Sequence, residues 1–341
     1  DNFVNIVALG RLNAKTVKSI YIYQMVGDMN LDVVISTGGD VHLIAAENIV
    51  DANNNNSNNV IGRHITLVSE TGGIGSWDNF LDIDSTDGKV DAQAVKDIFL
   101  VDTAGNLNVG VIKSTTGDIY LKANGYILDY HNNGKANIIG NNITLESIKG
   151  GVGNIDNLLD LDSAVGTKGE VNIKAAGGIY IQEVAGNMSI GQIMSKTGDV
   201  YVKAAGHILD HDNTDGANII GRSITLVSVT GGIGSIDNFL DIDSAANRGG
   251  KVDANAATHV YLHEIAGDMS LGNVNATTGD VYLKAQGSIL DHDNNTKANA
   301  KGRNITLEAI KGGIGRLNNY MDVSAAGKLT ARATGSIYIY E

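Results

Sequence analysis

Aspartate and histidine cluster at three places in the chain, in an order that acid–base catalysis could use. The clusters read Asp129-Tyr130-His131, Asp210-His211-Asp212 and Asp291-His292-Asp293. A carboxylate beside an imidazole can exchange a proton with a substrate near neutral pH. Each cluster leads into an asparagine-rich stretch, however, and the place of His211 is taken by Ala52 in an earlier copy. A cluster that recurs with the scaffold favours a polar surface loop, and we expect the chain not to be an enzyme.

Pairs of aspartates two residues apart form a second group with a chemical use. Residues i and i+2 of a strand point to the same face, so each pair would present two carboxylates together. Carboxylate oxygens are ligands that Ca²⁺ prefers, which makes calcium the one cofactor that the sequence suggests. A solvated acidic surface without metal is the other interpretation. The candidate calcium ligands are Asp82, Asp84, Asp160, Asp162, Asp241 and Asp243.

Tyrosines at equivalent places form a candidate binding surface. Tyr120, Tyr201 and Tyr282 each follow a Gly-Asp phrase and one β-branched residue, and strand alternation predicts that their side chains point outward. Exposed aromatic rings can stack on sugar rings or on another protein surface. Tyrosine is also common on half-buried strands for packing alone. A second aromatic set has a different phase and comprises Tyr21, Phe99, Tyr180, Tyr261 and Tyr338.

A Gly-Gly-x-Gly phrase occurs once per repeat, at 72–75, 150–153, 231–234 and 312–315. Calcium-binding nonapeptide repeats contain a similar phrase, but they need tandem copies at a spacing of about nine residues. A tight corner with a positive φ is therefore the better interpretation. We expect Gly232 to be such a residue and to tolerate a β-branched side chain poorly.

These groups recur because the whole chain is a repeat. The phrase Gly-Asp-Val-Tyr-Leu-Lys-Ala and its variants contain Asp40, Asp118, Asp199 and Asp280, which follow one another at a nearly constant spacing. A constant long period predicts one stacked array rather than separate globular domains. We expect one continuous repetitive segment over 1–341. It divides into a partial repeat (1–38), three repeats (39–116, 117–197 and 198–278) and a second partial repeat (279–341).

Short runs alternate apolar and polar residues, as in Ile143-Thr144-Leu145-Glu146, and no segment has the 3.6-residue period of a helix. We therefore predict an all-β parallel β-helix (β-solenoid) with coils of about 27 residues, three to each repeat of about 80. Two interior rows are expected. One holds Val41, Ile119, Val200 and Val281 with Leu43, Leu121, Val202 and Leu283. The other holds Leu81, Leu159, Leu240 and Met321 with Ile83, Leu161, Ile242 and Val323.

Composition narrows the classes of partner. The 341 residues carry a net charge of −13, which disfavours nucleic acid and anionic membrane surfaces because both attract basic proteins. The absence of cysteine excludes a disulfide framework. No proline interrupts the chain, as suits a sequence paired along most of its length. No apolar run is long enough to cross a membrane as a helix, so we expect no membrane insertion in this segment.

The repeat phrase, followed by Asn-Ile-x-Gly-x-x-Ile-Thr-Leu, resembles the repeats of filamentous-haemagglutinin-like bacterial exoproteins. These are surface adhesins that a dedicated outer-membrane partner secretes. The resemblance implies a right-handed β-helix, an extracellular or cell-surface location (attached to the outer membrane or released) and a structural role in adhesion, aggregation or biofilm. It implies no catalytic residue. A polysaccharide-binding or polysaccharide-cleaving β-helix protein is the alternative.

The expected partners follow from the same comparison. Asp1 to Val7 and Ser336 to Glu341 both read as ordinary repeat interior, and unpaired strand edges favour further pairing. We therefore expect neighbouring repeats or other copies of the chain to stack end to end. Surface polysaccharide is the other expected partner.

Overall fold

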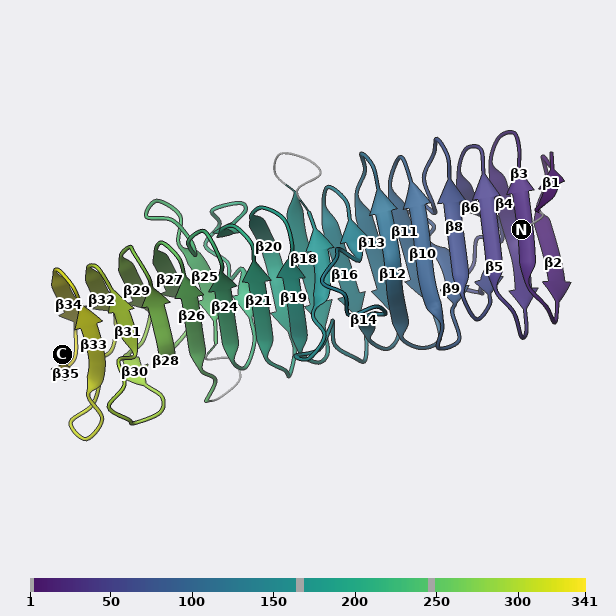
Figure 1. The fold of residues 1–341 in the computed structure, drawn as a ribbon. Coiled ribbons are helices and arrows are strands. Elements are labelled where there is room, and N and C mark those ends of the chain that lie inside the picture. Colours follow the sequence, from purple (N-terminus) through teal and green to yellow (C-terminus); the bar gives the residue numbers. More distant parts are fainter. Residues whose placement is uncertain (1–2, 164–168, 245–248) are drawn as a thin grey trace. The chain divides into compact units, whose positions relative to one another are not determined.

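The computed structural model describes residues 3–163, 169–244 and 249–341, and within these ranges the chain consists of strands and turns without a helix. It therefore contains, in the described part, no helix that could span a membrane. The chain forms two compact units, residues 1–169 and 170–341, and the division falls inside the repeat predicted at 117–197. Each unit is a stack of parallel strands (Figure 1). The predicted all-β solenoid is thus confirmed.

Two parallel sheets form the first unit, and the chain passes through them alternately, with two of the passages divided into a pair of short strands. Its first sheet contains β1 (Val4–Ile6), β3 (Ile20–Gln24), β5 (Val41–Ala45), β8 (Ile65–Ser69), β10 (Lys89–Ala94), β12 (Leu107–Ser114), β14 (Ile127–Asp129), β15 (Ile138–Ile139) and β17 (Leu159–Asp162). Its second sheet contains β2 (Leu12–Thr16), β4 (Met29–Ser36), β6 (Ile49–Asp51), β7 (Val60–Ile61), β9 (Leu81–Asp84), β11 (Ile98–Asp102), β13 (Ile119–Ala123) and β16 (Ile143–Ser147).

The second unit is built in the same way. One of its sheets contains β19 (Ile179–Glu183), β21 (Val200–Ala204), β24 (Ile224–Ser228), β26 (Val252–Ala256), β28 (Met269–Ala276), β30 (Ile289–Asp291), β31 (Ala300–Gly302) and β33 (Met321–Ala325), beside which β35 (Ile339–Tyr340) pairs. The other contains β18 (Glu170–Ala175), β20 (Met188–Ser195), β22 (Ile208–Asp210), β23 (Ile219–Ile220), β25 (Leu240–Asp243), β27 (Val260–Glu264), β29 (Val281–Ala285), β32 (Ile305–Ala309) and β34 (Leu329–Ala333).

The coils are shorter than predicted, at about 22 residues rather than 27. Ile20 pairs with Val41, which pairs in turn with Ile65, so these three residues mark successive passages of the chain through one sheet. Some long strands obscure the coil length in the sequence, because one long strand can lie beside two short ones. The eight-residue strand β28 pairs with β26 on one side and with the two short strands β30 and β31 on the other.

Each repeat contains an odd number of strand positions, so equivalent residues of successive repeats lie in different sheets. Seven positions separate β3 from β11, its equivalent in the next repeat, when the short strands β6 and β7 count as one. The strands β3 and β11 belong to different sheets of the first unit. In the second unit, β19 and β27 are related in the same way. Val41 and Ile119, which the sequence places in one interior row, therefore lie in different sheets. A repeat is about three and a half coils, not three.

The core lies between the two sheets of each unit. Strands such as β5 and β13 alternate buried and half-buried residues, as the period of two requires. All sixteen predicted interior side chains are buried, with Val323 the most exposed of them at 4%. The assignment of side chains to the inside and outside of the strands is thus confirmed, although the rows that they form differ from the prediction.

The glycine-rich corners contain a positive φ, but at a different residue from the one predicted. Gly234 has a φ of +64°, and Gly75, Gly153 and Gly315 share this geometry. Gly232 does not have a positive φ; a Cβ there would instead overlap the imidazole ring of His259. The reason for glycine at 232 is close packing rather than backbone conformation.

Candidate functional site

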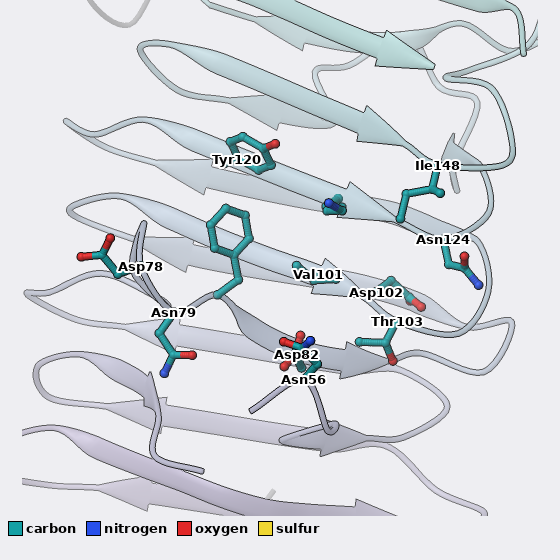
Figure 2. Close-up of a pocket in the computed structure, with 12 residues that line it drawn as sticks. Asn56, Asp78, Asn79, Asp82, Val101, Asp102, Thr103, Tyr120, Asn124 and Ile148 are labelled. Atoms are coloured by element: carbon teal, nitrogen blue, oxygen red, sulfur yellow. The ribbon is translucent and has the colours of Figure 1, made fainter. Parts of the chain in front are cut away.

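A groove of about 490 Å³ opens on the second sheet of the first unit, over β9, β11 and β13 (Figure 2). Phe80 and Tyr120 give it an aromatic wall, and Val101 and Ile148 are further apolar lining residues. Carboxylate, amide and hydroxyl groups line the remainder: Asn56, Asp78, Asn79, Asp82, Asp102, Thr103 and Asn124. The groove thus combines flat apolar rings with many hydrogen-bonding groups.

The aromatic wall is a contiguous cluster. Phe80 packs edge-on against Tyr120, with ring centroids 4.8 Å apart, and lies 5.4 Å from Phe99. Trp77 adds a further ring 5.8 Å from Tyr120 and is 67% exposed. Phe99 and Tyr120 are direct cross-strand partners in β11 and β13. The two aromatic sets that the sequence separates by phase therefore meet in one patch.

Two carboxyl groups line the inner part of the groove. Asp82 is only 6% exposed, and burial together with the negative charge of Asp51 raises its pKa to about 6. Asp102 is 1% exposed and accepts a hydrogen bond of 3.0 Å from the Ser85 hydroxyl. Burial raises the pKa of Asp102 as well. Both groups therefore hold a proton at a higher pH than a surface aspartate does.

The positive charge of Lys122, in the outer part of the groove, is neutralised by a neighbouring glutamate. The Lys122 ammonium lies 3.0 Å from Oε2 of Glu146. The Tyr120 hydroxyl donates to the same carboxylate oxygen at 3.2 Å. Lys122 is thus paired with an acid of its own, and the other charged groups that line the groove are negative.

A buried asparagine holds the loop beside the groove. The side-chain amide of Asn59 donates to Oδ1 of Asp51 at 2.6 Å and to the carbonyls of Leu31 and Asp32, while its own Oδ1 accepts from the backbone N–H of Asp82 at 3.0 Å. The asparagine-rich loop between β6 and β7 is fixed at both ends as a result. Asn137, Asn218 and Asn299 make the same pair of bonds with Asp129 and Asp160, Asp210 and Asp241, and Asp291 and Asp322.

A second groove, of about 270 Å³, occupies the equivalent place in the second unit. Tyr320 and Asp322 occupy the positions in this groove that Phe80 and Asp82 occupy in the first groove. The Tyr320 and Tyr338 rings meet edge-on with centroids 6.1 Å apart. Asn294, Asn295, Thr296 and Asn319 supply amides and a hydroxyl. An aromatic ring, a buried aspartate and neighbouring amides therefore occur together on both units.

The third repeat has the same aromatic pair but a different charged group. Phe239 packs edge-on against Tyr282 at 4.9 Å. His263 takes the place of Val101, and its Nδ1 lies 3.0 Å from Oδ1 of Asp241. Nε2 of His263 is buried and has no hydrogen-bond partner among the described residues. This repeat thus supplies its own imidazole beside the buried aspartate.

The predicted aspartate pairs do not converge on a common ligand. Asp82 is buried in the groove, whereas Asp84 is half-buried and accepts a bond from the backbone of Thr86. Asp160 and Asp241, the counterparts of Asp82, are also buried, so an open acidic surface is wrong for these positions. Asp162 and Asp243 are half-buried like Asp84. In the described ranges no three acidic or histidine side chains gather in a group that could hold a metal ion.

The aspartate–histidine clusters are anchors of loops. Asp129, Asp210 and Asp291 are buried against the asparagine of their own loop. His211 and His292 lie with Nδ1 at 3.1 Å from the hydroxyls of Ser189 and Ser270. The sequence interpretation as surface loops therefore agrees with their geometry, but successive loops of a unit lie in different sheets rather than at one corner.

Tyr120, Tyr201 and Tyr282 point outward, as the alternation predicts, and their side chains are half-buried. Phe80, Trp77, Asp51 and Asn59 were not recognised from the sequence as residues of a site. A signal existed for Asn59, because an asparagine follows each loop aspartate by eight residues in all four copies. No protein-family model, curated protein or solved structure matches the chain.

Proposed function

We propose that the chain is an adhesive structural module that binds polysaccharide through its aromatic grooves. The observation that carries this proposal is the repetition of one constellation, Phe80 with Asp82 and Tyr320 with Asp322, on the two units. Aromatic faces stack on the apolar faces of sugar rings, and neighbouring amides and carboxylates bond the hydroxyls. A regular solenoid holds such sites at fixed places.

Binding is a better assignment than cleavage. A glycosidase needs a local pair of carboxyl groups in the roles of acid and base or nucleophile, and such a site usually departs from the pattern of its scaffold. Here the aspartate and aromatic positions recur with the repeat, as an array of equivalent binding sites would. The resemblance to filamentous-haemagglutinin-like repeats supports an extracellular, cell-surface location, which is part of the same proposal. End-to-end association with further repeats stays a prediction from the sequence.

The charge of the first groove selects among sugars. Asp78, Asp82 and Asp102 are acidic, and Lys122 is occupied by Glu146. A polysaccharide of uronic acids or sulfated sugars would meet uncompensated negative charge, which costs free energy in a partly buried site. We therefore assign neutral hexose or amino-sugar polymers rather than anionic ones.

Affinity electrophoresis of the whole chain in gels containing neutral, amino-sugar or uronic-acid polymers tests the assignment. Retardation by a neutral or amino-sugar polymer is expected, and the double variant Phe80→Ala with Tyr120→Ala should bind at least tenfold more weakly, because ring stacking is lost. Tyr126→Ala is the matched control, since Tyr126 is 48% exposed and does not line the groove. Retardation by none of the polymers, or equal binding by both variants, would contradict the proposal.

A further inference from the structure

One oxygen of Asp51 has an unusual environment. Oδ1 accepts bonds from Asn59 and from the backbone N–H groups of Asn53 and Asn54. Oδ2 is buried and has no hydrogen-bond partner among the described residues, and the residue as a whole is only 7% exposed. A buried carboxylate oxygen without a partner is costly, so it points to a group that the protein chain does not supply.

Asp82, whose carboxyl group is also buried, is linked to Asp51 through Asn59. The two ends of the Asn59 side chain hold Asp51 Oδ1 and the backbone of Asp82 at 2.6 and 3.0 Å. The charge of Asp51 acts directly on Asp82. Asn79 fixes the same region, because its amide donates to the Asp51 carbonyl at 3.0 Å. Figure 2 shows Asp82 and Asn56 at one end of the groove. Asp82 thus lines the groove, and Asp51 is joined to it by the side chain of Asn59.

The same feature recurs in the second unit. Oδ2 of Asp291 is buried and without a partner in the described part of the chain, and Asn299 links Oδ1 of Asp291 to the backbone N–H of Asp322. Asp322 lines the groove beside Tyr320, whereas Asp291 lines an adjoining pocket that Arg316 also lines. In the second repeat the chain satisfies the oxygen itself, because the backbone N–H of Asn132 donates to Oδ2 of Asp129 at 2.7 Å.

The third repeat shows what can stand beside such a pair. Oδ2 of Asp210 also lacks a partner in the described residues, but His263 lies 3.0 Å from the second aspartate, Asp241. The chain itself thus supplies a partner for one of the two carboxylates. At the corresponding place in the first repeat is Val101, which pairs with Asp82 in register as His263 pairs with Asp241. Val101 carries no charge, so the pair in the first repeat is left for a cation from solution.

We propose that Asp51 with Asp82, and Asp291 with Asp322, each bind one divalent calcium ion. Two carboxylates supply the charge, and loop amides, hydroxyls and water supply the further oxygens that Ca²⁺ coordinates. Only two charged ligands predict weak binding, in the range of about 10⁻⁴ to 10⁻³ M that extracellular calcium modules show. Mg²⁺ should bind more weakly, because it demands an octahedral site and keeps its water. The inference does not depend on polysaccharide binding. A calcium ion at Asp82 would reduce the negative charge of the first groove, so the sugar preference proposed above applies to the calcium-free chain.

Isothermal titration of the whole chain with CaCl₂ alone tests this assignment. The expected result is two weak sites and a rise in melting temperature with calcium, with a smaller effect of MgCl₂. Asp82→Asn should remove one of the two sites. Asp84→Asn is the matched control, because it makes the same charge change on the same strand, β9, and should leave both sites intact.

A second variant checks the comparison with His263. Val101→His should place an imidazole beside Asp82 and remove the first site at a pH where the imidazole is protonated. No heat and no thermal shift at about 10 mM CaCl₂, well above the expected dissociation constants, would overturn the proposal. Two sites remaining in Asp82→Asn, or a site lost in Asp84→Asn, would also overturn it. If the whole chain binds calcium but retards on none of the polysaccharides, the proposed function is contradicted and the calcium proposal stands.

Discussion

Glu264 receives a hydrogen bond of 2.5 Å from the Ser244 hydroxyl in a position that is fully buried. The repeat places Gln24 at the equivalent position near the start of the chain, where it is 1% exposed and donates to the carbonyls of Ala8 and Val26. An acid and its neutral amide analogue thus fill the same kind of site. Burial is the main cause that raises the pKa of Glu264 to about 8, and the nearby Asp243 adds to the effect.

This pKa predicts that stability falls as the pH rises. The pKa of Glu264 is 4.5 in its ordinary state and about 8 in the fold, so between these values the folded chain holds a proton that the unfolded chain has released. The free energy of unfolding should therefore decrease from pH 5 to pH 8. Glu264→Gln should flatten this slope, and its advantage over the wild type at pH 9 should be a few kcal/mol, on the order of 1.4 kcal/mol per pKa unit.

Urea unfolding at pH 5, 7 and 9 measures this effect. Gln24→Glu is the reciprocal control and should introduce a new loss of stability at high pH. Equal slopes for the wild type and Glu264→Gln would show that the buried acid does not control the pH dependence.

Two substitutions by aspartate, one at an inward and one at an outward position, test which side chains of the strands face the core. Ile242→Asp should cost roughly 3–5 kcal/mol, because Ile242 is completely buried and the new charge has no partner. Thr225→Asp, on the outward face of β24, should change stability by about 0.5 kcal/mol or less. Chemical denaturation compares the two, and similar losses would contradict the arrangement of the core.

The buried asparagine should contribute strongly to stability. Asn218 donates to Asp210 at 2.7 Å and accepts from the backbone of Asp241 at 2.9 Å, so Asn218→Ala would leave several buried groups without partners. The expected loss is about 2–4 kcal/mol. Asn273→Ala, at an exposed strand position, is the control and should be nearly neutral. Hydrogen exchange of the loop between β22 and β23 should rise only in Asn218→Ala.

The corner glycines should differ in their tolerance of alanine. Gly234→Ala faces both a φ of +64° and a backbone oxygen, that of Tyr261, which the new Cβ would overlap. At Gly232 the nearest atom belongs to the His259 side chain, which can move. Gly234→Ala should therefore lower the melting temperature more than Gly232→Ala, while Gly105→Ala, with open space around it, should change little. The opposite order would mean that side-chain packing dominates at these corners.

The sequence predicts local features of the strands better than their partners. Alternation along a single short strand is enough to show that Leu240 and Ile242 face inward, because the period of two is a property of one strand. Coil length depends on which strand lies beside which. The strand β28 has the same apolar period whether it pairs with one neighbour or with two, so its alternation could not reveal the count of about three and a half coils per repeat.

The candidate site shows the same limit. Tyr120 follows from its place in the repeat phrase. Its contact with Phe80, which immediately precedes β9, two strands earlier in the same sheet, depends on how the coils stack. The proposed pairing of Asp82 with Asp51, rather than with Asp84, has the same origin. Neighbours at i and i+2 on one strand share a face, yet the loop that closes over Asp82 belongs to the preceding coil. Contacts between coils are set by packing, which no short spacing expresses.

Because each repeat contains an odd number of strand positions, aromatic side chains lie on both sheets of each unit. In the first unit, Tyr21 and His42 stack at 4.6 Å on one sheet, while Phe99 and Tyr120 lie on the other. In the second unit, the paired Tyr180 and Tyr201 and the paired Tyr261 and Tyr282 are likewise on different sheets. Under the proposed function, a ligand polymer bound on one sheet leaves the other sheet free for a second polymer. A single unit would therefore act as a cross-linker, and a mixture with a long polymer should thicken as the protein concentration rises, through avidity rather than through stronger individual contacts.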